Sequence, residues 1–133
     1  MHFAKSILLL MDETDLDIVD IVNAIIPGEK HLPGMRYCGP GTRLDLRLDE
    51  DGTPKPGCEP VDRVDEAALR HDIAYSKHND LRHRNMADKE MIHSLLNIEQ
   101  PTCRERCERC FVLPIMYLKR IIGSMIVRVM DLF

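Results

Sequence analysis

The stretch DEAALRHDIAY, residues 65–75, decides the fold. An apolar side is supplied by Val64, Ala67, Ala68, Ala74 and Tyr75. Either Asp62 or Asp65 can cap the first turn by accepting a hydrogen bond from a backbone amide. We therefore predict a helix over residues 62–78, which ends at the turn-forming Asn79.

Three side chains of this helix are suited to chemistry. Residues four apart share a helix face, so His71 and Tyr75 point the same way, whereas Asp72 lies ~100° further round. A histidine and an aspartate at adjacent helical positions do not easily bond each other, but they can serve one site from two sides. We expect His71 to take a proton while Asp72 holds a cation.

The rest of the chain divides into helices and loops. Apolar residues recur at three and four over residues 12–26 and 86–98, and residues 111–133 carry a heptad-like apolar seam, so three further helices are predicted. Residues 27–60 are too rich in glycine and proline for a helix or a central strand, and residues 103–110 form a polar segment. A loop of this length in a small domain is usually functional, and a bound ion would hold it.

The composition limits the kind of protein. A chain of 133 residues with 44% apolar and 30% charged residues suits one globular domain. A net charge of −4, 5% aromatic residues and no tryptophan argue against a nucleic-acid partner. The apolar run from Ile7 to Met11 is too short for an export signal, so we expect cytosolic synthesis.

The five cysteines do not predict a disulfide framework, because their number is odd and no export signal precedes them. We expect free thiols. Two alternatives stay open, namely zinc bound by the Cys103, Cys107 and Cys110 group together with Cys58 or His93, and a Cys38–Cys58 disulfide in an oxidising compartment.

The loop residues YCGPG, 37–41, are suited to calcium. Calcium takes about six to eight oxygen ligands, many of them backbone carbonyls, which converge only where the chain bends sharply. Gly39 and Gly41 allow such a bend because glycine tolerates positive φ. The carbonyls of Tyr37, Gly39 and Gly41 could then face one ion, with the Asp72 carboxylate as the charged ligand.

These groups predict a hydrolase without a covalent nucleophile. Neutral His71 would act as general base on a water, and Asp88 on the next helix would fix its tautomer. Tyr75 would support Asp88 through its hydroxyl. Calcium would polarise an ester carbonyl, and the Gly39 backbone N–H would be a second donor to the oxyanion.

The sequence resembles the calcium-dependent phospholipase A2 superfamily, and within it the parvovirus-type domain of minor capsid proteins. The stretch LPGMRYCGPGTRLD, residues 32–45, is similar to the YxGPGxxLD signature of that group. The stretch DEAALRHDIAY is similar to its helix in which a DxA motif precedes HDxxY, and MAD, residues 86–88, is similar to the AD that precedes its third helix. Similar domains occur in densoviruses and in virus-derived mobile elements of invertebrates.

The resemblance implies a mostly α fold with a glycine-rich calcium loop and two antiparallel catalytic helices, 62–78 and 86–98. It also implies hydrolysis of the sn-2 ester of a phosphoglyceride. His71 would be the base and Asp88 its partner. Asp72 would bind calcium together with the loop carbonyls.

The chain departs from relatives of this kind in two ways. Secreted members carry cysteines beside the His-Asp pair, whereas this helix has none, as in the virus-type branch. The connection around residues 49–58 is also longer than in vertebrate parvoviruses, and we expect it to form a surface excursion. We divide the chain into an N-terminal helix and linker (1–31), a catalytic core (32–98) and a C-terminal region (99–133).

Several expectations concern the setting. The resemblance implies a phospholipid membrane surface as partner, virion association, and breach of an endosomal membrane during entry. The terminal helices could instead mediate self-association or contact a capsid protein. One alternative is a catalytically inactive lipid- or partner-binding module on the same fold, and another is a structural assembly protein.

Overall fold

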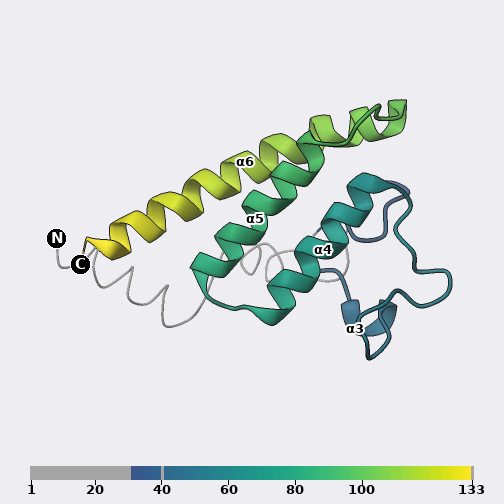
Figure 1. The fold of residues 1–133 in the computed structure, drawn as a ribbon, viewed down its shortest axis with the longest axis horizontal. Coiled ribbons are helices and arrows are strands. Elements are labelled where there is room, and N and C mark those ends of the chain that lie inside the picture. Colours follow the sequence, from purple (N-terminus) through teal and green to yellow (C-terminus); the bar gives the residue numbers. More distant parts are fainter. Residues whose placement is uncertain (1–30, 40, 133) are drawn as a thin grey trace.

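The computed structural model describes residues 31–39 and 41–132, and it is mostly helical (Figure 1). Its helices are α3 (Leu44–Arg47), α4 (Arg63–Lys77), α5 (Leu81–Leu96) and α6 (Cys103–Asp131). Within these residues the only β pairing is an isolated bridge between Leu48 and Pro54. The mostly α fold predicted from sequence is therefore correct, and the helix predicted over residues 12–26 lies outside the described residues.

Helices α4 and α5 are antiparallel neighbours joined by a short turn, and α6 runs back along α5 (Figure 1). An aspartate caps the first turn of each of the helices α4 and α5. Asp62 begins α4 by accepting from the Asp65 amide at 2.9 Å, and Asp80 begins α5 by accepting from the His83 amide at 3.1 Å. Each cap satisfies an amide that the helix itself leaves unpaired.

Two helices begin earlier than predicted. Helix α5 begins at Leu81 rather than 86, because Asp80 caps it and Leu81 is buried, while the charged residues that follow face solvent. Helix α6 takes in the whole of 103–110, because Thr102 and Glu105 form a capping box that starts it at Cys103. A third difference is the one-turn helix α3, inside the predicted loop 27–60.

The core lies where α4, α5, the first half of α6 and the loop before α3 meet. Leu95 and Val64 are completely buried there, and burying a side chain of this size contributes ~1.5–3 kcal/mol. The small residues Ala67 and Ala68 of α4 belong to the same core. Its other buried members are Met35, Tyr37, Cys38, Leu69, Met91, Ile92, Val112 and Met116.

A forked ion pair ties the start of α6 to the start of α4. Arg63 donates from Nε to Glu105 Oε2 and from Nη2 to Glu105 Oε1, both at 2.8 Å. The hydrogen bonds from Arg63 lower the pKa of Glu105 to about 2, although burial of the carboxylate opposes them. The pair fixes the angle at which α6 leaves the core.

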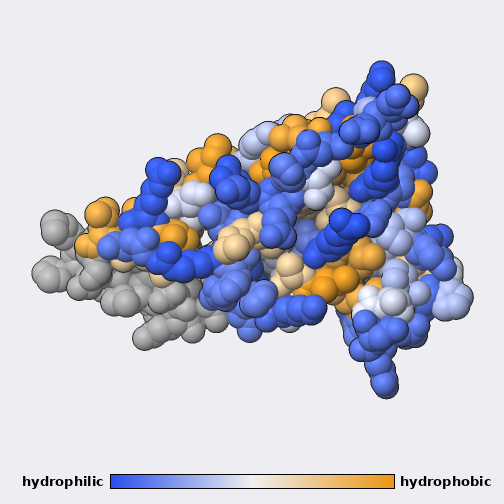
Figure 2. All heavy atoms as spheres, viewed as in Figure 1, coloured by the Kyte–Doolittle hydropathy of each residue, from blue (hydrophilic) through white to orange (hydrophobic). Residues whose placement is uncertain are grey.

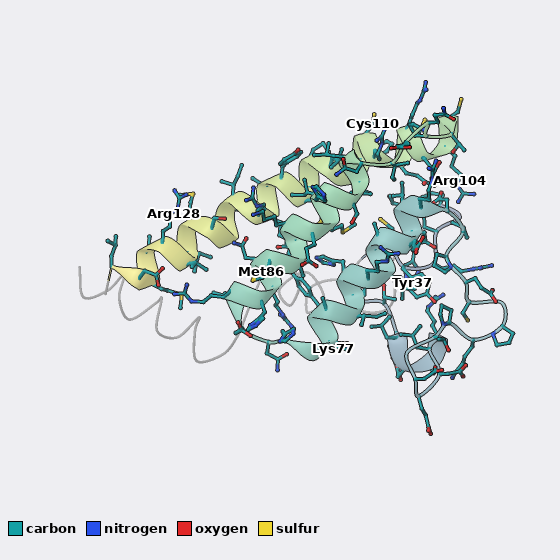
Figure 3. The ribbon with its side chains drawn as sticks, in the orientation of Figure 1. Tyr37, Lys77, Met86, Arg104, Cys110 and Arg128 are labelled. Carbon is teal, nitrogen blue, oxygen red and sulfur yellow. The ribbon has the colours of Figure 1, made fainter. Side chains whose placement is uncertain are left out.

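The outward side of α6 is apolar over most of its length. Figure 2 shows hydrophobic side chains along this helix, and α6 is the one helix in the described ranges that is long and apolar enough to cross a membrane. Figure 3 shows Cys110 and Arg128 on the side of α6 away from α5. The inward side packs on α5.

Candidate active site

A histidine and an aspartate from neighbouring helices form the centre of the site. His71 Nε2 of α4 lies 2.7 Å from Asp88 Oδ1 of α5, and the Tyr75 hydroxyl donates to the same oxygen, also at 2.7 Å. The rings of His71 and Tyr75 are 4.3 Å apart. The structure therefore brings together the three side chains that the sequence predicted for proton transfer.

A lysine from α6 completes this group. Lys119 Nζ lies 3.1 Å from Asp88 Oδ1, donates to the Tyr75 hydroxyl and sits 3.9 Å from the centroid of the Tyr75 ring. Sequence reasoning missed Lys119, because it lies 31 residues from Asp88 in the chain and belongs to no motif with it. The only available signal was a charged residue inside the apolar seam of 111–133.

The charges around Asp88 keep it ionised. Burial raises the pKa of Asp88, but the hydrogen bonds from His71 and Tyr75 and the charge of Lys119 outweigh burial, so that the pKa is lowered. Because Asp88 is an acceptor, the Nε2 of His71 carries the proton of their hydrogen bond. The lone pair of neutral His71 is then on Nδ1, as a general base requires.

The free side of His71 faces Asp72. His71 Nδ1 is 3.7 Å from Asp72 Oδ1, and both residues line one cavity. Burial lowers the pKa of His71, but interactions with the carboxylates of Asp72 and Asp88 more than offset it, so that the pKa is raised. The adjacent residues thus serve one site without a direct hydrogen bond between them.

The glycine loop is anchored to α4 by Asp65. This carboxylate is fully buried and accepts from the backbone amides of Arg36 (3.1 Å), Tyr37 (2.8 Å) and Val61 (3.1 Å). Tyr37 is also held through its hydroxyl, which donates to the Cys58 carbonyl at 2.5 Å. Asp65 was one of two predicted caps for α4, but Asp62 caps the helix and Asp65 positions the loop.

The loop presents oxygen atoms to one place. Thr42 Oγ1 lies 3.4 Å from the Tyr37 carbonyl oxygen and 3.3 Å from that of Gly39, so both carbonyls face the same hydroxyl. Gly39 has a φ of +154° and Gly41 a φ of +77°, conformations that favour glycine. Thr42 was not among the predicted site residues, although it directly follows the glycine motif.

Asp72 is the charged side chain that best suits a bound cation. Its Oδ2 atom is buried and has no hydrogen-bond partner, and burial raises the pKa of Asp72. An orphaned buried carboxylate oxygen is costly unless a cation or donor meets it. Together with the carbonyls of Tyr37 and Gly39 it would supply the all-oxygen donor set that calcium prefers, so the chemistry of the residues present fits that ion.

A second group of possible metal ligands lies at the turn between α4 and α5. The ligand atoms of His78, Asp80 and His83 lie within 4.8 Å of one another. Two imidazoles and one carboxylate suit a transition metal better than calcium. Asp80 is already engaged by the His83 ring at 2.6 Å, and none of these residues belongs to the predicted calcium loop.

An apolar cavity of about 400 Å³ opens beside the His71–Asp72 pair. The glycine loop forms one wall through Tyr37, Cys38 and Gly39, and α4 contributes Ala68. Helix α6 supplies Phe111, Val112, Ile115 and Met116. A cavity of this size and lining suits an extended apolar chain better than a polar metabolite.

The model of the phospholipase A2-like domain family matches residues 28–105. The chain belongs to this family. The match spans the glycine loop, the antiparallel helices α4 and α5 and the first residues of α6, and it ends before Lys119. Comparison with curated proteins and with solved structures found no match.

Family membership indicates a phospholipase-type hydrolase and does not assign roles to single residues. The roles of His71, Asp88 and Tyr75 in proton transfer, and of Gly39 as an oxyanion donor, stay predictions. So do the calcium ligands, the Asp72 carboxylate and the carbonyls of residues 37, 39 and 41.

Proposed function

We propose that this protein is a calcium-dependent phospholipase A2, which hydrolyses the sn-2 ester of phosphoglycerides. The observation that carries the proposal is the His71–Asp88 hydrogen bond of 2.7 Å beside an apolar cavity. The orphaned Oδ2 of Asp72 on the other side of His71 supports the calcium requirement.

In this reaction His71 Nδ1 removes a proton from a water whose oxygen attacks the ester carbonyl carbon. Asp88 holds the ring in the required tautomer and stabilises the imidazolium that forms. The bond to the glycerol oxygen then breaks, and His71 returns its proton to that oxygen. The products are a fatty acid and a lysophospholipid, and no covalent enzyme intermediate is formed.

The glycine loop stabilises the oxyanion in this proposal. The backbone N–H of Gly39 is the donor available from the protein. Calcium, held by Asp72 and the carbonyls of Tyr37, Gly39 and Gly41, would polarise the ester carbonyl and offset its developing charge. Asp65 keeps the loop in place for both groups, since it binds the amides of Arg36 and Tyr37.

The cavity gives the substrate its orientation. Its apolar walls suit an acyl chain, which places the ester at the His71 end and leaves the head group outside. A phospholipid membrane surface is then the partner. By its resemblance to the parvovirus-type domain, we extend the proposal to a virion-associated enzyme that breaches a membrane during entry.

The direct test is release of fatty acid from vesicles that contain anionic phospholipid, with calcium and with a chelator. We expect release only with calcium, and none from His71→Gln. His93→Gln is the matched control, because His93 is an exposed histidine of α5 outside the site. Folded wild-type protein without calcium-dependent turnover would leave the inactive lipid-binding module as the better account.

A further inference from the structure

The exposed side of α6 carries no charge over most of its length. Five large apolar side chains, Phe111, Ile115, Leu118, Ile121 and Met125, are each more than half exposed, and we call this set the apolar face of α6. Every exposed residue of the helix from 107 to 125 is uncharged. At about 1.5 Å per residue, this face from Phe111 to Met125 is about 21 Å long.

Such a face is unusual for a protein surface that meets only water. Soluble monomers rarely expose continuous apolar patches of more than a few hundred Å², and larger ones mark docking sites. Phe111 is 68% exposed and Ile115 is 66% exposed, although both lie on a helix that packs against α5. Figure 2 shows hydrophobic side chains at several places along α6.

The apolar face is continuous with the candidate active site. Phe111 and Ile115 belong to the face and also line the cavity beside His71. The apolar face and the cavity lining therefore adjoin at Phe111 and Ile115. A lipid chain could pass from a leaflet into the cavity between these two residues without crossing water.

The charges along α6 favour a lipid surface over a second copy of this chain. Helix pairs that associate through a heptad seam usually carry charged residues beside the seam, whereas no exposed residue between 107 and 125 is charged. Arg106 precedes the apolar face and Arg128 follows it, and both are exposed. Arginines at both ends suit phosphate head groups.

The inward side of α6 favours a helix that lies flat over one that spans the membrane. It carries Arg109, which donates to the Leu95 carbonyl at 3.0 Å, and Lys119, which is paired with Asp88. A spanning helix would leave these cations in hydrocarbon and remove Lys119 from the site. A flat helix keeps both contacts and immerses the apolar face alone.

We propose that the apolar face of α6 is a membrane-docking surface, which lays the helix flat in one leaflet of a bilayer containing anionic phospholipid and turns the mouth of the cavity toward the lipid. The proposal rests on the proposed function for its substrate, but docking is a binding event that is measured without turnover.

The test is co-sedimentation with phosphatidylcholine vesicles that contain phosphatidylserine, in chelator so that no lipid is hydrolysed. The variant is Leu118→Glu with Met125→Glu. The control is Leu46→Glu with Leu96→Glu, since these leucines are also more than half exposed but lie on α3 and α5. Circular dichroism melts verify that all three proteins fold.

We expect the α6 variant to partition to vesicles at least about tenfold less than wild type, and the control to bind as wild type does. Equal partitioning of the two variants would overturn the proposal. The proposal would also be overturned if the wild type were a dimer that does not bind vesicles and the α6 variant were a monomer. The apolar face of α6 would then bind a second copy of the chain.

Docking and catalysis can fail separately. Vesicle binding that depends on the α6 face, with no fatty acid released when calcium is added, would support docking and refute the phospholipase assignment. If the wild type hydrolyses a monomeric short-chain phospholipid but does not bind vesicles, the phospholipase assignment is supported and the docking proposal is refuted.

Discussion

Lys119 Nζ and Asp88 Oδ1 lie 3.1 Å apart, and both are almost completely buried. The same carboxylate oxygen also accepts from His71 and Tyr75, so three hydrogen bonds, two from α4 and one from α6, would be lost or rearranged if it moved. Because the family match ends before Lys119, α6 adds a cation to a site whose other members lie inside the matched region.

Replacing Lys119 by methionine should lower kcat by about tenfold, equivalent to ~1.4 kcal/mol, and leave KM nearly unchanged. Without the lysine, Asp88 loses a buried partner and holds His71 less firmly. Lys119→Arg should recover part of the loss because it keeps the charge. The comparison is with Lys89→Met, an exposed lysine of α5. A fall in thermal stability with unchanged kcat would mean that Lys119 only supports the fold.

The pH dependence of activity should follow the neutral form of His71. Since Asp72 and Asp88 raise the pKa of His71 against the effect of burial, the ring should titrate above pH 6.5 in the calcium-free protein, and the acid limb of kcat/KM should follow the same group. Asp88→Asn should lower the pKa of His71, because a negative partner is removed. NMR titration of the His71 ring measures both values, and an unchanged pKa in Asp88→Asn would show that the hydrogen bond does not hold in solution.

Burial of Glu108 predicts a loss of stability as the pH rises from about 4.5 to neutral. Burial and the neighbouring Asp62 raise its pKa to about 7. The folded protein therefore binds this proton more tightly than the unfolded chain, so the stabilisation is full below about pH 4.5 and is lost as the pH rises through 7. The glutamine of Glu108→Gln cannot ionise. Between pH 5 and pH 8 the free energy of unfolding of this variant should therefore fall by about 1 kcal/mol less than that of wild type. Thermal melts at the two pH values test this, and parallel behaviour of both proteins would contradict it.

The sequence predicted the helical pair and the residues at its centre because both are local patterns. His71 and Tyr75 are separated by one helical turn, and a capping aspartate precedes each of α4 and α5. Lys119 could not be predicted in the same way. Its contact with Asp88 depends on the path of α6 across α5, which is set by packing rather than by any spacing in the chain.

Two other misses have different physical causes. The capping box of Thr102 and Glu105 was present in the sequence, but the charged residues after it favoured an exposed segment over a helix start. Asp65 was read as a helix cap because both roles use a carboxylate that accepts from amides. Only the structure shows that its amides come from the loop at Arg36 and Tyr37.

The loop anchor itself makes a prediction. Asp65→Asn replaces one acceptor oxygen by an NH2 group that faces the backbone amides of Arg36, Tyr37 or Val61. A buried donor without a partner costs ~1–3 kcal/mol, so thermal stability should fall by that amount. Calcium affinity, measured by calorimetry at a temperature where the variant is folded, should fall as well, because the Tyr37 and Gly39 carbonyls lose their support. Loss of stability with unchanged calcium affinity would place the ion away from this loop.

Asp72→Asn tests calcium binding independently of folding. In chelator the variant should be as stable as wild type or more so, because a buried carboxylate with an orphaned Oδ2 becomes a neutral amide, and burial already disfavours the charged form. With calcium the order should reverse, since wild type gains stability by binding the ion and the variant does not. Activity should be lost in parallel with calcium affinity. Melting curves in chelator and in calcium test both statements, and equal stabilisation of the two proteins by calcium would mean that Asp72 is not a ligand.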